Sequence, residues 1–177
     1  MTIVAPRRLR PGILATAACL ALTAGLVSAT TASAAGATPA CTNADLTASY
    51  RLGGGAMGTT YGRIVLTNTS SHACHTGGYG GVSYVGDGNG TQIGAAAVRT
   101  DHAAVRTFVL EPGQRLRSRI AATDALNYPR HRCRPAHVDG FRVYVPNATT
   151  SQYVAAPTTG CRNARIHLLL QKPLRRP

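Results

Sequence analysis

Apolar and polar residues alternate along much of the chain after residue 40, which is the pattern of β-strands with one buried face. In the segment 59–68, Ile64 and Leu66 fall on one face of such a strand. Arg63 and Thr67 fall on the opposite face, because successive side chains of a strand point to opposite sides. Helical periodicity is hard to find in this part of the chain, so the pattern predicts an all-β fold.

Seven to nine short strands follow from this alternation and from the turns that separate its segments. Asp-Gly-Asn-Gly at 87–90 and Glu-Pro-Gly at 111–113 are strong turn sequences, and Leu-Gly-Gly-Gly at 52–55 is expected to break the chain. Closely spaced short strands are typical of an immunoglobulin-like antiparallel β-sandwich. The predicted strands are 45–51, 59–68, 82–85, 91–97, 104–110, 115–121, 138–145, 152–154 and 165–170.

The N-terminus has the features of a secretory signal peptide. Three arginines within the first ten residues precede an apolar stretch at 13–27, and Ala-Ser-Ala at 32–34 is a typical cleavage sequence. We expect residues 1–34 to be removed on export, which leaves no membrane span. The Arg7-Arg8 pair leaves the twin-arginine route open, although the general secretory route is favoured. Cys19 lies inside the apolar stretch and is expected to leave with it.

Basic residues greatly outnumber acidic residues in the sequence. The chain of 177 residues has 19 Lys and Arg against 6 Asp and Glu, a formal charge of +13, and all the acids lie after residue 34. The length predicts one domain, which we expect to be monomeric. We divide the exported chain into a short linker at 35–40, a β-sandwich domain at 41–171 and a basic tail at 172–177.

Four cysteines remain after the predicted cleavage, and an even number in an exported chain predicts two disulfides. The directions of the predicted strands favour the pairs Cys41–Cys74 and Cys133–Cys161, although four cysteines permit three pairings. A zinc site is disfavoured, because the chain has no Cys-x-x-Cys pair.

Several short motifs also carry a family resemblance, and they are spread over about residues 41–171. They are Cys41 with Asp45-Leu46, the strand end Leu66-Thr67-Asn68-Thr69-Ser70-Ser71, Cys74, Gly78-Tyr79-Gly80-Gly81-Val82-Ser83, Leu110-Glu111-Pro112-Gly113, Cys133-Arg134-Pro135, Val143-Tyr144-Val145-Pro146 and Cys161. This set resembles the secreted actinobacterial family called domain of unknown function 4232. The resemblance implies an exported β-domain and no particular activity. The family usually has proline where Gly80 stands, and the strong positive charge is atypical of it.

Arginines supply the first candidate site. Arg115, Arg117 and Arg119 alternate with other residues of one predicted strand, so they share a face at intervals of about 7 Å. Such a row could bind a polyanion: a cell-wall phosphate polymer, anionic lipid or extracellular nucleic acid. The alternative is that these arginines are solvated residues that protect a sheet edge. The next loop adds three further candidates, Arg130, Arg132 and Arg134.

Histidines supply a weaker candidate. His72 and His75 flank Cys74, and a copper or zinc site on an exported β-sandwich could use such ligands. Oxidised cysteines cannot bind metal as thiolates, and the alternative is that both are ordinary loop histidines. We therefore expect no metal and no cofactor.

The short motifs that resemble catalytic signatures are incomplete. Gly81-Val82-Ser83 begins like a nucleophile elbow, but Val85 stands where the second glycine is required. We therefore expect a non-catalytic binding module, secreted or associated with the cell wall, whose partner is an anionic envelope polymer or a protein. The rival hypotheses are a secreted metal-binding or enzymatic β-domain that uses the histidines, and a protease-inhibitor-like domain that presents the loop 127–134.

Overall fold

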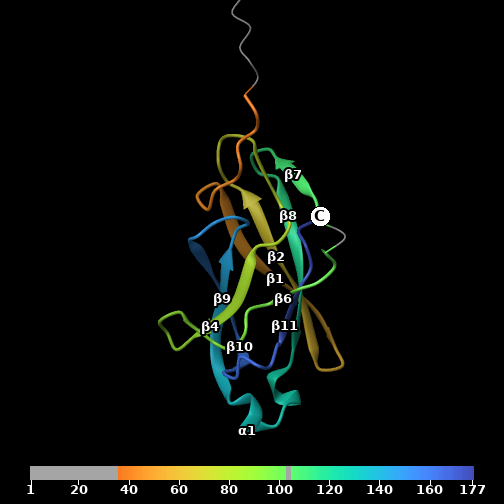
Figure 1. Cartoon of the computed structure of the whole chain (residues 1–177), viewed down its shortest axis with the longest axis vertical. Helices are drawn as coiled ribbons and strands as arrows, with labels where there is room; N and C mark the ends of the chain where they lie inside the picture. Colours follow the sequence, from red (N-terminus) through yellow and green to blue (C-terminus); the bar gives the residue numbers. More distant parts are fainter. Residues whose placement is uncertain (1–35, 103–104) are drawn as a thin grey trace, which may run out of the picture. The chain divides into compact units, whose positions relative to one another are not determined.

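Strands dominate the residues that this computed structural model describes, 36–102 and 105–177 (Figure 1). The predicted signal peptide and its cleavage site lie outside the described residues. The strands are β1 (Leu46–Ala56), β2 (Thr59–Asn68), β3 (Cys74–Gly77), β4 (Gly81–Gly86), β5 (Thr91–Gln92), β6 (Val98–Arg99), β7 (Thr107–Leu110), β8 (Arg115–Thr123), β9 (Pro135–Tyr144), β10 (Ser151–Cys161) and β11 (Leu169–Gln171). A 3₁₀ turn, η2 (Ala125–Asn127), and a short helix, α1 (Arg130–Cys133), connect β8 to β9. Neither these nor any other helix in the described part of the chain is long and apolar enough to cross a membrane.

The described strands form three sheets. One has five strands in the order β1-β2-β8-β11-β6, the second has four in the order β10-β9-β4-β5, and β3 pairs with β7. The two larger sheets bury a common core to which β2 and β8 contribute Ile64 and Leu116, and β9 contributes Phe141 and Val143. The predicted all-β sandwich is confirmed. One described strand pair, β6 with β11, is parallel, whereas the prediction was of antiparallel pairing.

Alternation along β2 and β8 follows the prediction. Ile64 and Leu66 of β2 are each 2% exposed, whereas Arg63 is exposed. On β8, Leu116 and Ile120 are buried in the core. Because both strands have one face in the core, every other residue of each points away from it.

Two strands are predicted much too short, and both are edge strands of the large sheets. The glycines at 53–55 do not break the chain: β1 continues through them, with a shift in its pairing to β2 between Leu52 and Gly55. The strand predicted at 152–154 is β10, which extends to Cys161 with a similar shift between Ala155 and Thr158. A β-bulge of this kind lets a strand continue through residues that do not fit the ladder.

Short elements account for the other differences. Strands β3 and β6 and helix α1 were not predicted, because four residues or fewer carry too little periodicity to be recognised. The strand predicted at 165–170 begins only at Leu169, and that predicted at 91–97 is reduced to β5. The turn at 87–90 is confirmed, since it joins the paired strands β4 and β5.

Both favoured disulfides are present. Cys41 is bonded to Cys74 at the start of β3, and Cys133 at the end of α1 is bonded to Cys161 at the end of β10. Cys74 and Cys133 are completely buried. Each disulfide therefore joins two peripheral segments to the core.

Both ends of the described domain reach beyond the predicted boundaries. In the predicted linker, Pro39 O accepts a hydrogen bond of 2.8 Å from His75 N. In the predicted basic tail, the Arg175 N–H donates to Arg117 O at 2.9 Å, and Leu174 is 1% exposed. The segment 172–177 thus packs along β8 as part of the domain.

Candidate binding surface

Seven basic side chains gather on the outer face of the five-stranded sheet, which we call the basic face. Its members are Arg51 of β1, Arg63 of β2, Arg115, Arg117 and Arg119 of β8, and Lys172 and Arg175 of the segment that follows β11. All seven are exposed or half-buried, whereas their neighbours Leu116, Ser118 and Ile120 are buried. The alternation of β8 therefore places its three arginines together, as predicted.

Register places the other basic residues beside those of β8. Arg51 lies opposite Arg63, and Arg63 lies opposite Arg119. On the far side of β8, the backbone N–H of Lys172 donates to the backbone carbonyl of Arg119 at 2.9 Å, which places Lys172 beside Arg119. A cationic row thus crosses four neighbouring segments, which are about 4.8 Å apart in a sheet. In the next row, Arg117 and Arg175 lie opposite each other in an isolated antiparallel β-bridge.

This arrangement is hard to explain by stability alone. Like charges directly opposite each other in a sheet are destabilising, and the basic face contains the pairs Arg51–Arg63, Arg63–Arg119 and Arg117–Arg175. Protection of a sheet edge is also a poor explanation, because β8 is the central strand of its sheet. An anion lying across the rows would relieve the repulsion.

Three adjoining depressions mark the basic face, and arginine side chains line each of them. Arg117 lines all three, Arg119 lines two, and Arg63 lines two. Asp101 is the one acidic residue along these depressions, where its Oδ2 lies 3.5 Å from the Lys172 Nζ. One carboxylate leaves the basic face with a large excess of positive charge.

The second group of predicted arginines lies elsewhere. Arg130 and Arg132 belong to α1, and Arg134 caps this helix in the left-handed conformation (φ 51°). None of the three lines the depressions of the basic face, and Figure 1 shows α1 beyond the end of β8. The structure therefore divides the six predicted arginines into two separate groups.

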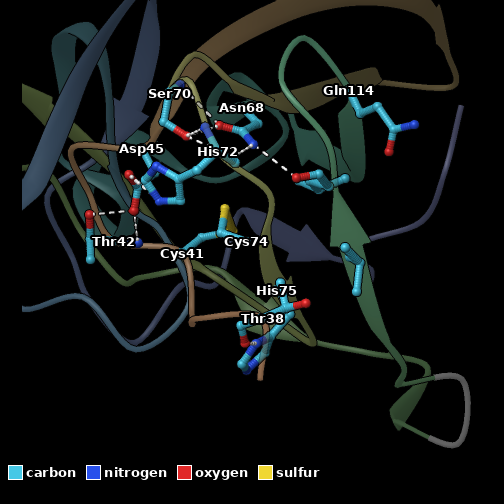
Figure 2. The surroundings of a disulfide bond; sticks show 12 residues. Thr38, Cys41, Thr42, Asp45, Asn68, Ser70, His72, Cys74, His75 and Gln114 are labelled. Atoms are coloured by element: carbon cyan, nitrogen blue, oxygen red, sulfur yellow. Dashed lines mark hydrogen bonds and ion pairs between the residues drawn. A yellow bond between two sulfur atoms is a disulfide. The ribbon is translucent and has the colours of Figure 1, made fainter. Parts of the chain in front are cut away.

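The predicted histidines do not converge. The His72 Nε2 lies 3.5 Å from Asp45 Oδ1, while the His75 Nδ1 lies 2.8 Å from Thr38 O. Figure 2 shows the two imidazoles on different sides of Cys74. Among residues 36–102 and 105–177, no group of three His, Cys, Asp or Glu side chains is placed to hold a metal ion. The Asp45 partner of His72 was missed, because it is distant in the sequence.

Asp45 anchors the turn that precedes β1. Its Oδ2 accepts hydrogen bonds of 2.7 Å from both the N–H and the hydroxyl of Thr42. These bonds, and to a lesser degree the nearby His72, hold the pKa of the Asp45 carboxyl below its ordinary value of 3.8. The charged carboxylate is therefore the form that stabilises the folded chain.

Stability should consequently depend on pH at this residue. A carboxyl whose pKa is lower in the folded state stabilises the fold above its unfolded pKa, and that stabilisation is lost as the pH falls through the folded pKa. We expect urea unfolding to show that Asp45→Asn is less stable than the parent at pH 7, and that the difference shrinks between about pH 4 and pH 2. A difference that stays constant over this range would contradict the assignment.

Comparison with known proteins identifies the family of this chain. No curated protein and no solved structure matches the chain. A family model described as "Domain of unknown function (DUF4232)" matches residues 41–168, which include both disulfides and most of the strands that carry the basic face. Because this match covers well over half of the sequence, the chain belongs to the DUF4232 family.

Proposed function

We propose that this domain is a non-catalytic binding module that works outside the cell or in its envelope and holds an anionic polymer on the basic face. The observation that carries the proposal is the cationic row from Arg51 through Arg63 and Arg119 to Lys172. Two disulfides are characteristic of proteins in oxidising compartments and support an extracellular location.

Chemistry of the side chains favours phosphate as the anionic group. Six of the seven basic residues are arginines, and the planar guanidinium matches two oxygens of a phosphate at once. Along β8, successive arginines recur at about 7 Å, and across the sheet the interval is about 4.8 Å. Rows of this kind fit a repeating charge better than a single ion. We therefore propose a phosphodiester polymer of the envelope as the ligand.

A polyphosphate probe tests this assignment. Binding of fluorescently labelled inorganic polyphosphate is measured across a salt series for the exported protein and for Arg63→Gln/Arg117→Gln/Arg119→Gln. Because each lost phosphate contact lowers the slope of log K against log salt by about 1, we expect the slope to fall by about 2 to 3. At low salt we expect the triple variant to bind at least about tenfold more weakly. Retention on isolated cell wall should change in parallel.

The chain itself offers a matched control. Arg130→Gln/Arg132→Gln/Arg134→Gln removes the same total charge from α1 and its cap, outside the basic face. This control should bind polyphosphate nearly as well as the parent. Equal losses in both triple variants would show that net charge alone matters, and the basic face would then not be a site. Absence of binding by the parent at low salt would direct the search to protein partners.

A further inference from the structure

The seam between the two large sheets is closed at one end and open at the other. Strand β1 is the edge of one sheet, and β10 is the edge of the other. The Gln152 side chain of β10 closes one end of the seam, because its Oε1 accepts a hydrogen bond of 2.8 Å from Ala48 N. The Gln152 Nε2 donates to Asn43 Oδ1 at 3.0 Å and to Leu46 O at 2.5 Å.

Bulges in both edge strands open the other end of the seam. The pairing of β1 shifts between Leu52 and Gly55, and that of β10 shifts between Ala155 and Thr158. The opening has a volume of about 630 Å³, which is within the range of small-molecule sites. Bulges are frequent beside binding sites, because they redirect side chains and end local pairing.

Aromatic rings form the inner wall of this opening, which we call the seam pocket. The centroid of the Phe141 ring lies 5.0 Å from the centroid of the Tyr50 ring and 5.1 Å from that of the Tyr84 ring. Phe141 is 2% exposed and Tyr84 is 5% exposed. Half-buried Tyr50 thus supplies the accessible part of a rigid aromatic wall, which Phe141 and Tyr84 support from behind and on which a flat molecule could pack.

The Tyr50 and Tyr84 hydroxyls at this wall make no hydrogen bond to another described residue. No buried side-chain oxygen or nitrogen in the described part of the chain lacks a partner, so both hydroxyls are accessible from the opening. Elsewhere in the domain, by contrast, the Tyr79 and Tyr153 hydroxyls both donate to backbone carbonyls. Burial raises the pKa of Tyr50, and burial together with the adjacent Tyr50 raises that of Tyr84. Both hydroxyls therefore stay protonated and can donate.

The rim of the seam pocket is apolar and exposed. Leu52 is 68% exposed and Leu126 is 64% exposed, and both line the opening. Asp124 is the one charged residue in the lining, and its negative charge disfavours an anion. An apolar rim, aromatic walls and unpaired donors together describe a site for an uncharged ligand.

We propose that the seam pocket binds a small, flat, apolar molecule whose carbonyl oxygen accepts hydrogen bonds from the Tyr84 and Tyr50 hydroxyls. Such a ligand satisfies the two donors and covers Leu52 and Leu126. This site is distinct from the basic face, because it opens on the inner side of the five-stranded sheet, although Leu52 lines both the seam pocket and one depression of the basic face.

Nile red, an uncharged dye with a ring carbonyl, is a suitable probe. Its emission should rise and shift to the blue on binding to the exported protein, residues 35–177. We expect Tyr84→Phe to weaken binding about threefold to tenfold, since one hydrogen bond is lost. Leu126→Asp, which adds a charge at the rim, should weaken binding at least about tenfold.

Matched controls separate the seam pocket from non-specific dye binding. Tyr153→Phe removes an exposed hydroxyl elsewhere, and Val109→Asp places a charge at an exposed apolar site on β7. Both controls should bind the dye as the parent does, and so should Arg117→Gln/Arg119→Gln. Tyr84→Phe should keep the melting temperature of the parent, because the hydroxyl has no partner. No emission change with the parent, or equal binding by Leu126→Asp and Val109→Asp, would overturn the proposal.

Discussion

Replacement of all four disulfide cysteines by alanine is expected to lower the free energy of unfolding by about 7 kcal/mol. The disulfides close loops of 33 and 28 residues, and the chain-entropy relation assigns about 3.5 kcal/mol to each. The two loops do not overlap, so their effects should add to about 7 kcal/mol. A small domain has a total stability of roughly 5 to 15 kcal/mol, so the loss is about half of it or more.

Single-pair variants make this prediction quantitative. Urea unfolding followed by circular dichroism should show that Cys41→Ala/Cys74→Ala and Cys133→Ala/Cys161→Ala each lower the free energy of unfolding by about 3 to 4 kcal/mol. Reduced and alkylated parent protein serves as the control for the fourfold variant, since it lacks both bonds but keeps the sulfur atoms. A loss below about 1 kcal/mol for either pair would contradict the proposed contribution of that disulfide.

Asn68→Ala should be the most destabilising single substitution of a polar residue at the disulfide end of the sandwich. Asn68 is completely buried, and its Nδ2 donates at 2.9 Å to both His72 O and Leu110 O (Figure 2). Its Oδ1 accepts hydrogen bonds from the N–H and the hydroxyl of Ser70. Alanine leaves the buried carbonyl of Leu110 without this donor, so we expect a loss of about 3 kcal/mol.

Asn89 provides the matched control. Its Oδ1 accepts the same pair of hydrogen bonds, from the N–H and the hydroxyl of Thr91, but in an exposed turn. Asn89→Ala should lower the free energy of unfolding by no more than about 0.5 kcal/mol. Similar losses for Asn68→Ala and Asn89→Ala in urea unfolding would show that the buried bonds to His72 and Leu110 contribute little.

Local patterns predicted the faces of the strands and the pairs of cysteines. Alternation with a period of two depends on neighbouring residues alone, so the outward positions of Arg63, Arg117 and Arg119 followed from the sequence. The disulfide pairs followed from an even number of cysteines and from the directions of the predicted strands.

Long-range register could not be predicted in the same way. Arg63 lies beside Arg119 only because β2 pairs with β8, a partner more than 50 residues away in the sequence. Arg51 and Lys172 enter the same row through two further pairings. The seam pocket was missed for a related reason, because it depends on bulges in two strands that do not pair with each other.

The basic face consists mainly of outward-facing strand residues, so these residues can change in evolution without a change of fold. Outward residues of β2 and β8 contact solvent, whereas the residues between them form the core. Exchange of Arg63, Arg117 or Arg119 for an acidic or neutral residue would thus change the charge of the sheet and leave the packing beneath it intact. Related domains can accordingly diverge in the charge of this face while they inherit one scaffold.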